Sequence, residues 1–366
     1  MNNISRNRLK KLKPFFDRQR LDAILLTSAA NIFYLTGFLF GDPNTQEAVA
    51  IVNKNKSPVI FMPAMFQDQA KKVFSNIKVK ICNQKNRLFP TLVKHLKDKR
   101  IGFEPYNLTV GQYNRLRQKK ISLISLSKKF TNLRQQKEKQ ELEKIKKAVE
   151  ITDKTFEMVI KNIKPGKTER EIAALVKQSM ENLGADREAF PAIVASGKNS
   201  AIPHHQPTNK KIKSKEIVLV DMGAKKDGYN SDMTRTIFIG KPSTEFIKKY
   251  KIVKKAQENA IKNAKPKMKG DEIDQLVREI FKKEGVEKHF LHTTGHGIGV
   301  LPHEAPSLAP KSKDKVSIDS VVTIEPGLYW PGWGGIRIED LTVMTKSGLE
   351  IISKAPYFTF PNTASL

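Results

Sequence analysis

Five residues in the second half of the chain carry the side chains of a two-metal site: Asp221, Asp232, His296, Glu325 and Glu339. Their four carboxylates balance the charge of two divalent cations and can bridge them. The imidazole favours Mn, Co, Fe or Zn over Mg or Ca. A metal pair of this kind activates water at neutral pH and stabilises a tetrahedral transition state. The residue types therefore indicate a metal-dependent hydrolase.

The first two acids lie on either side of a strong hairpin signal, Asp227-Gly228. If these two residues form the loop, strands over 217–224 and 229–240 pair so that Asp221 lies opposite Thr234. Asp232 is then a diagonal neighbour on the same face, close enough to share a metal pair. We therefore predict that this hairpin presents both acids toward one site.

The same logic applies to Glu325 and Glu339, which flank a turn over residues 331–335. Carboxylates on the inward faces of strands are costly to bury unpaired, which favours a common counter-charge. His296 lies between two glycines, which permit a close approach of the backbone to a ligand or metal. One such acid alone is better interpreted as a solvated strand residue, and one such histidine as structural. The complete set is better interpreted as a site.

Composition bounds the classes of protein that fit. The chain has 366 residues, of which 39% are hydrophobic, enough for two domains with proper cores. No run approaches the ~18 uninterrupted apolar residues that a membrane span requires. The single cysteine, Cys82, excludes an internal disulfide framework and suits a reducing cytoplasm.

The net charge of +29 raises the alternative of a nucleic-acid partner. Lysine is spread along the whole chain, however, and no zinc-finger, RNA-recognition or helix-turn-helix motif accompanies it. We therefore interpret the charge as solvated surface and expect no nucleic-acid partner.

Two domains are expected, residues 1–130 and residues 131–366. In the first, short apolar runs alternate with helical patterns such as residues 88–96, which is typical of an α/β layer domain. The second opens with a long charged helix over residues 135–163. The predicted strands of the first domain lie at 23–26, 48–52, 58–61, 77–81 and 100–103.

An internal repeat relates the two halves of the second domain. Residues 164–184 align with residues 265–285. Each copy predicts a helix that begins at a cap, Thr168 in the first and Asp271 in the second, and ends at a glycine. Chance similarity of two capped helices is the alternative. A duplicated half with pseudo-twofold symmetry explains more, because it makes two acid-bearing hairpins face one another.

These motifs resemble the pita-bread metallopeptidase family, which includes Xaa-Pro aminopeptidases, Xaa-Pro dipeptidases and methionine aminopeptidases. The resemblance covers essentially the whole chain, and its motifs lie at 196–204, 231–236, 296–299, 303–304, 324–327 and 336–340. The stretch 31–38 is similar to the N-terminal domain of the proline-specific members and of creatinase, which typical methionine aminopeptidases lack. The resemblance implies an α/β (α+β) chain, in which a creatinase/prolidase-like domain precedes a pita-bread catalytic domain.

The resemblance also implies a role for each ligand at the matching positions. Asp221 would chelate the first metal alone, and His296 and Glu325 would hold the second. Asp232 and Glu339 would bridge the two metals. Glu325 would also move a proton toward the leaving nitrogen, which makes it a catalytic residue. Mn is the expected metal, with Co, Zn or Fe as alternatives, because ligand types alone do not select it.

Three histidines complete the implied site. His204 and His303 match catalytic histidines that contact the substrate and stabilise the oxyanion. His204 is preferred to its neighbour His205 because its spacing to the first acid fits the family. His292 is a candidate substrate-binding residue, with a structural role as the alternative.

Arg337 is a further catalytic candidate, since it lies two residues before Glu339. We expect it to face away from the metals or to reach Asp232 and support that ligand. Trp330 and Trp333 flank the turn between the two glutamates and are expected to pack, with pocket lining as the alternative.

The implied function is that of an Xaa-Pro aminopeptidase, which acts on peptides with proline at the second position. An Xaa-Pro dipeptidase, or prolidase, is the main alternative. The two activities differ in how loops, the N-terminal domain and a partner subunit close the cleft, and the motifs do not determine this. A non-catalytic binding protein of this fold and a metal-free creatinase-like hydrolase are disfavoured by the complete ligand set. We expect a cytoplasmic homodimer, with a tetramer as the alternative, and no membrane partner.

Overall fold

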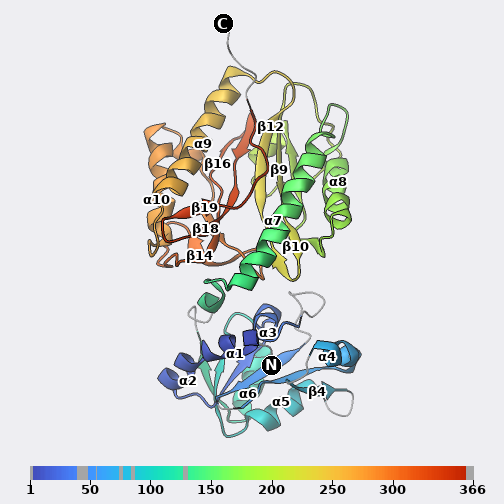
Figure 1. Cartoon of the computed structure of the whole chain (residues 1–366), viewed down its shortest axis with the longest axis vertical. Coiled ribbons are helices and arrows are strands. Elements are labelled where there is room, and N and C mark those ends of the chain that lie inside the picture. Colours follow the sequence, from blue (N-terminus) through green and yellow to red (C-terminus); the bar gives the residue numbers. More distant parts are fainter. Residues whose placement is uncertain are drawn as a thin grey trace. The chain divides into compact units, whose positions relative to one another are not determined.

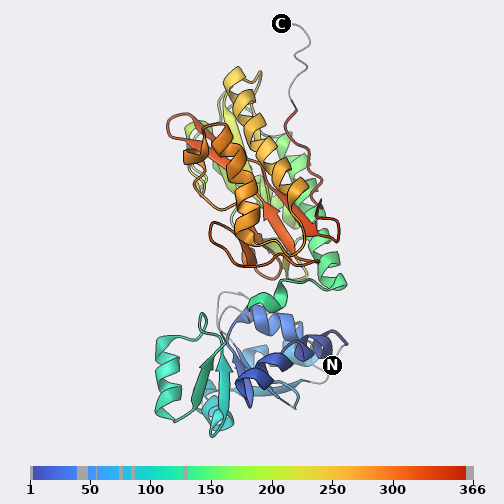
Figure 2. The same cartoon turned by 90° about the vertical axis from the view of Figure 1, so that its left-hand side faces the viewer.

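The computed structural model describes residues 3–38, 48–54, 56–73, 77–83, 87–126 and 131–359. The chain divides into two compact units, residues 1–133 and residues 134–366 (Figures 1 and 2). The predicted end of the first domain, residue 130, falls among residues 127–130, outside the described residues. Within the described ranges, no helix is both long and apolar enough to cross a membrane.

The first unit is built on a six-stranded mixed sheet in the order β4-β3-β2-β1-β5-β6. β2 runs antiparallel to both of its neighbours, and the other neighbouring pairs are parallel. The five predicted strands are present, whereas β6 was not predicted because its apolar run, Leu123-Ile124, is short. The strands are β1 (Ala23–Leu26), β2 (Val49–Asn53), β3 (Val59–Pro63), β4 (Lys78–Cys82), β5 (Arg100–Phe103) and β6 (Ser122–Ser125).

Helices cover both faces of this sheet, because successive strand residues point to opposite sides. Ile24 and Leu26 join the core beneath α2, α3 and α4, whereas Ala23 and Leu25 join the core beneath α5 and α6. The helices are α1 (Asn3–Lys10), α2 (Lys13–Gln19), α3 (Ala29–Thr36), α4 (Gln67–Val73), α5 (Leu88–Leu96) and α6 (Val110–Gln118). Short 3-10 helices lie at Ala64–Phe66 and Thr131–Arg134.

The second unit places strands between two pairs of helices (Figure 1). One pair is α7 (Lys139–Ile160) with α8 (Glu169–Asn182), and the other is α9 (Thr244–Asn263) with α10 (Gly270–Lys283). α7 is shorter than the predicted 135–163, because Glu138 caps it and donates its backbone N–H to Glu141 at 3.0 Å. Each pair packs on its own hydrophobic core, which joins it to the strands of its half.

The strands of the second unit form short antiparallel sheets in the orders β11-β10-β7, β12-β9-β8, β14-β13-β15-β18-β19 and β16-β17. The first half supplies β7 (Arg187–Glu188), β8 (Ile193–Ser196), β9 (Ile217–Met222), β10 (Ala224–Lys226), β11 (Tyr229–Asn230) and β12 (Met233–Phe238). The second supplies β13 (Gly295–Gly297), β14 (Glu304–Leu308), β15 (Val321–Ile324), β16 (Gly327–Trp330), β17 (Gly334–Arg337), β18 (Asp340–Met344) and β19 (Leu349–Ile351). Short 3-10 helices lie at Gly197–Ala201 and Glu287–His289.

The repeat noted in the sequence corresponds to α8 and α10, which begin at equivalent positions of the two copies. Both end as predicted, with Gly184 and Gly285 at positive φ. Thr168 caps α8 as expected, but the prediction for α10 is wrong, because Lys269 rather than Asp271 is its N-cap. At this helix end Glu272 Oε2 accepts from the backbone N–H of Lys269 at 2.6 Å, which satisfies the cap. A Cβ at Gly270 would lie 1.9 Å from the backbone oxygen of Ser307.

A buried arginine ties the two halves together. Arg235 on β12 is 1% exposed and donates from Nη2 to Asp340 Oδ1 at 2.7 Å. Its Nη1 donates to the backbone oxygen of Glu339 at 2.6 Å. Asp340 also accepts from Gln257 Nε2 at 2.8 Å and from the hydroxyl of Tyr357 at 2.7 Å. This network fixes the backbone at one of the predicted metal ligands.

Replacement of Arg235 by methionine should destabilise the second unit by about 3–5 kcal/mol, because it leaves a buried carboxylate uncompensated. Trp330 and Trp333 are the chain's two tryptophans, so their fluorescence during urea unfolding follows this unit alone. The exposed pair of Lys154 with Glu150 gives the control, since Lys154→Met should cost no more than about 1 kcal/mol. Equal losses in the two variants would contradict the assignment.

Candidate metal centre

The first acid-bearing hairpin is interrupted where the acids lie. β9 pairs with β12 in the predicted register, with Asp221 opposite Thr234. Asp232 lies in the gap between β11 and β12. Close to this gap, the backbone N–H of Ala224 donates to the hydroxyls of Thr152 and Ser231, both at 3.0 Å. Buried hydroxyl groups therefore satisfy the backbone where regular pairing stops.

The second hairpin breaks at the corresponding place. The ladder of β15 with β18 ends, and that of β16 with β17 begins, on either side of Glu325 and Glu339. We expected all four acids on strands, but Asp232, Glu325 and Glu339 lie in these breaks and only Asp221 lies on a strand. The breaks arise because each strand pair leaves one sheet and enters another.

His296 lies on β13, which is squeezed between β14 and β15. A Cβ at Gly295 would lie 2.1 Å from the backbone oxygen of Thr323, so a larger residue would not fit. The imidazole Nδ1 donates to the backbone oxygen of Gly297 at 3.1 Å. Its Nε2 then carries the lone pair and faces Glu325 Oε1 at 3.3 Å and Asp232 Oδ2 at 3.8 Å. This is the tautomer that a metal ligand needs.

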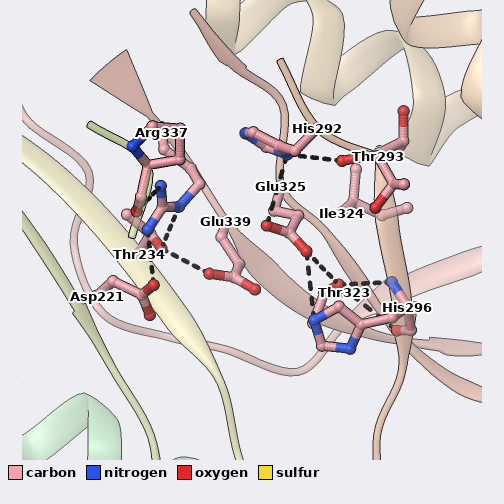
Figure 3. A network of polar contacts seen from close by, with 12 residues as sticks. Asp221, Thr234, His292, Thr293, His296, Thr323, Ile324, Glu325, Arg337 and Glu339 are labelled. Atoms are coloured by element: carbon pink, nitrogen blue, oxygen red, sulfur yellow. Dashed lines mark hydrogen bonds and ion pairs between the residues drawn. The ribbon is translucent and has the colours of Figure 1, made fainter. Parts of the chain in front are cut away.

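One cavity of about 430 Å³ collects the residues predicted from the sequence. Its wall is also apolar on one side, where Phe190, Pro191 and Ile193 lie. Figure 3 shows Asp221, Glu325, Glu339 and His296 around one space, with Arg337 next to Asp221. The predicted site residues that line it are Asp221, Asp232, His296, Glu325, Glu339, His204, His292, His303 and Arg337.

Burial and mutual repulsion raise the pKa values of three of the acids, Asp232, Glu325 and Glu339. Burial, followed by the charge of Glu339, raises the pKa of Asp232 well above its usual value. Burial, followed by the charge of Glu325, does the same to the pKa of Glu339. Burial raises the pKa of Glu325 to about 7, against the opposing effect of Arg337. Burial lowers the pKa of His296, which keeps its imidazole neutral. Added cations would relieve this repulsion.

The side chain of Arg337 takes neither of the two orientations predicted from the sequence. It neither faces away nor reaches Asp232, because its Nη2 donates to Asp221 Oδ2 at 2.6 Å. Arg337, the last residue of β17, and Glu339, in the break that follows it, both line the cavity. Its Nε donates to the hydroxyl of Thr234 at 3.0 Å, and that hydroxyl donates to Glu339 Oε2 at 2.6 Å. Arg337 therefore orients two of the acids at once.

Tyr329 is a site residue that we did not predict. Its hydroxyl accepts from Arg337 Nη1 at 2.7 Å and lies 2.9 Å from His292 Nε2. The sequence signal that could have found Tyr329 is its position four residues after Glu325, because residues an even number apart on an extended segment share a face. Burial lowers the pKa of His292 to about 3, so this imidazole is neutral and its Nε2 accepts a hydrogen bond from the hydroxyl of Tyr329. Its Nδ1 donates to the backbone oxygen of Thr293 at 2.8 Å, so both nitrogens are engaged.

The donor set fits divalent cations. The ligand atoms of Asp232, His296 and Glu339 lie within 4.8 Å of one another. Asp221 Oδ1 is buried and has no hydrogen-bond partner among the described residues. A buried carboxylate oxygen without a partner is costly, and a cation would satisfy it. Oxygen donors with one imidazole suit Mn, Co, Fe or Zn.

The remaining predicted side chains have distinct surroundings. His204 is exposed to the cavity, and the ring of His303 lies 4.1 Å from that of His296. His205 is buried and its Nε2 lies 2.9 Å from Glu169 Oε2, outside the acid cluster. The two tryptophans pack edge to face at 5.3 Å and contact Lys249, as the packing interpretation anticipated.

The two-unit fold and this acid-rich cavity define a metallopeptidase, and comparison with known proteins places the chain more closely. The model of metallopeptidase family M24 matches residues 143–346, and that of the creatinase/prolidase N-terminal domain matches residues 8–136. The chain belongs to metallopeptidase family M24. The resemblance stated from the sequence motifs is thereby confirmed.

Individual relatives span nearly the whole chain. It is 34% identical to a Xaa-Pro dipeptidase of Pyrococcus furiosus over 354 residues, 95% of this chain and 98% of that protein. A Xaa-Pro dipeptidase structure from Bacillus anthracis has a TM-score of 0.90 at 33% identity and covers 97% of this chain and 99% of that one. An X-Pro aminopeptidase structure from Thermotoga maritima has a TM-score of 0.87 at 31% identity and covers 96% and 99% respectively.

Divalent metal should stabilise the fold more at about pH 8 than at about pH 5.5. At acidic pH, protons compete with the metal for the carboxylates whose pKa values are raised. Asp232, Glu325 and Glu339 have raised pKa values in the fold, so they destabilise the metal-free fold as the pH rises above their unfolded pKa of about 4. For Glu325 that penalty is complete once the pH passes its folded pKa of about 7. Melting temperatures with and without MnCl₂ at each pH measure the difference. An equal increase at both pH values would contradict the prediction, and Asp232→Asn should reduce the increase at about pH 8.

Proposed function

We propose that the chain is an Xaa-Pro aminopeptidase, an exopeptidase that hydrolyses the bond between an N-terminal residue and a following proline. The observation that carries the proposal is the cavity in which the acid cluster, the neutral His296 and the exposed His204 and His303 meet. A complete donor set in an accessible cavity favours catalysis over a purely binding role. It equally disfavours a metal-free mechanism.

Two cations would be held by the five predicted ligands, with Mn expected and Co, Zn or Fe as alternatives. Asp221 would bind the first alone, His296 and Glu325 the second, and Asp232 and Glu339 both. When bound, the cations would activate water at neutral pH and stabilise charge that develops on the carbonyl oxygen. The protein's task is to hold these ligands apart from solvent and in fixed orientations.

The chain's own side chains supply the remaining chemistry. Glu325 lines the cavity beside His296 and would carry a proton toward the leaving proline nitrogen. His204 and His303 lie at the cavity wall, where an imidazole N–H can donate to the developing oxyanion. Arg337 acts indirectly, because it binds and orients Asp221 rather than the substrate. The wall formed by Phe190 and Pro191 suits an apolar proline ring.

The charges around the cavity favour an aminopeptidase over a dipeptidase. A dipeptide brings its carboxylate within one residue of the scissile bond, so a selective dipeptidase needs a nearby cationic group. Among the described residues that line the cavity, Arg337 is the one arginine or lysine, and Asp221, Thr234 and Tyr329 already engage it. A longer peptide carries its carboxylate away from the acids.

Xaa-Pro dipeptidase is the second candidate, because the relatives from Pyrococcus furiosus and Bacillus anthracis bear that name. A cationic group from a second copy of the chain would supply the missing recognition. We infer a homodimer, with a tetramer as the alternative, and sedimentation velocity distinguishes the two. A cytoplasmic location is inferred from the single cysteine.

The decisive assay compares Arg-Pro-Pro, Ala-Pro and Ala-Pro amide with metal-stripped protein reloaded with Mn. We expect kcat/KM for the tripeptide and for the amide to exceed that for Ala-Pro at least about tenfold, which corresponds to about 1.4 kcal/mol. The Asp232→Asn variant should lose all three activities. Preference for Ala-Pro over its amide would establish the dipeptidase instead. No turnover with Mn, Co or Zn would overturn the proposal altogether.

A further inference from the structure

The segment of residues 196–208 carries His204 to the cavity, and a buried carboxylate fastens both of its ends. Glu169, the first residue of α8, is 0% exposed. Its Oε1 accepts from Ser196 N and Oγ, both at 2.8 Å, and from Asn199 Nδ2 at 2.9 Å. Its Oε2 accepts from Thr208 N at 3.0 Å and from Thr208 Oγ1 at 2.7 Å. It also accepts from His205 Nε2 at 2.9 Å.

Every group that faces this carboxylate is a donor. Burial alone would raise the pKa of Glu169, but the hydrogen bonds from His205, Thr208 and Asn199 outweigh it and lower the pKa to about 2. The group is therefore ionised throughout the neutral range. An ionised acceptor with several donors is the strong form of a buried hydrogen-bond network.

The opposite side of the segment is held by β17. Ser200 Oγ accepts from the backbone N–H of Gly335 at 2.8 Å. The backbone oxygen of Pro203 accepts from Arg337 Nη1 at 3.3 Å. The two adjacent histidines follow Pro203, and both line the cavity. His204 is exposed to the cavity, whereas His205 is buried against Glu169.

We propose that Glu169 is a positioning residue for His204, because it fixes the segment on both sides of that histidine while β17 fixes its other face. This inference rests on the proposed function, in which His204 contacts the substrate. Glu169 itself does not touch the reacting atoms. Its role is to hold the imidazole where the oxyanion develops.

Replacement by glutamine keeps the shape of Glu169 but turns an amide NH₂ toward groups that are themselves donors. In Glu169→Gln, kcat for Arg-Pro-Pro should fall about 10- to 100-fold, the usual consequence of a displaced catalytic group. KM should change little, because the lost interaction belongs to the transition state. Mn affinity should be unchanged, since the segment contains none of the five proposed ligands.

Glu171→Gln is the matched control. Glu171 lies on the same helix, and its pKa is also lowered to about 2, but it bonds to Thr168 and Lys167 instead of the segment. Its replacement should leave kcat unaltered. An equal loss of kcat in both variants would overturn the inference. It would show that the loss comes from a disturbed start of α8 and not from the loosened segment.

A double-mutant cycle with His204→Ala tests whether Glu169 acts through this histidine. If it does, Glu169→Gln should lower kcat by less than about threefold in the His204→Ala background, because the two losses are not additive. Fully multiplicative losses would overturn the inference.

Amide hydrogen exchange separates this inference from the proposed function. Residues 196–208 should exchange faster in Glu169→Gln than in the wild type or in Glu171→Gln. If the wild type cleaves no Xaa-Pro peptide but the segment loosens, the proposed function fails and the anchoring stands. Unchanged exchange together with full activity would overturn the inference. If Glu169→Gln does not fold, Asn199→Ala removes one donor instead. A smaller fall in kcat with faster exchange would then support the inference, and no change in either would overturn it.

Discussion

The four carboxylates of Asp221, Asp232, Glu325 and Glu339 share one cavity, and their repulsion is the constraint on which the rest of the site depends. The described wall offers them one guanidinium, Arg337, which already binds Asp221. Without further positive charge Asp232 and Glu339 retain protons, as their raised pKa values indicate. Two divalent cations would supply that charge. The metal-bound state would then be both the stable state of the cluster and the one suited to hydrolysis. Folding and metal binding are thereby linked.

The scaffold must hold these groups together against that repulsion. Two helix pairs, each on its own core, support two hairpins that break where the acids lie. Arg235 crosses from one hairpin to the other and binds both Asp340 and the backbone at Glu339. Buried acids on the helices act in a similar way on other segments. Asp274 of α10, for example, accepts from the backbone N–H and hydroxyl of Thr294, two residues before His296. Breaking such buried pairs is expected to be costly, because each leaves a charge without a partner.

Much of this arrangement is encoded locally and could be predicted. The Asp227-Gly228 turn sets the register of its hairpin, so the pairing of Asp221 with Thr234 follows from the sequence. Patterns of caps and terminal glycines located α8 and α10 to within a residue or two. The errors arise where tertiary contacts decide. The start of α10 is held by a distant loop, since Gly270 N donates to the backbone oxygen of Asp314 at 2.8 Å. Arg337 points inward because the other hairpin supplies Asp221 and Thr234 as partners. Tyr329 was missed for the same reason, since its partners converge only in the folded chain.

The central claim is that this cavity binds a pair of divalent metal ions through the five predicted residues. Anomalous X-ray diffraction from crystals of the Mn-loaded protein tests it most directly, because it locates the ions without reference to activity. The account predicts two anomalous peaks inside the cavity, with Asp232 and Glu339 in contact with both and Asp221 and His296 on opposite sides. A cavity without an anomalous peak at saturating Mn, or peaks confined to other acidic groups on the surface, would contradict it.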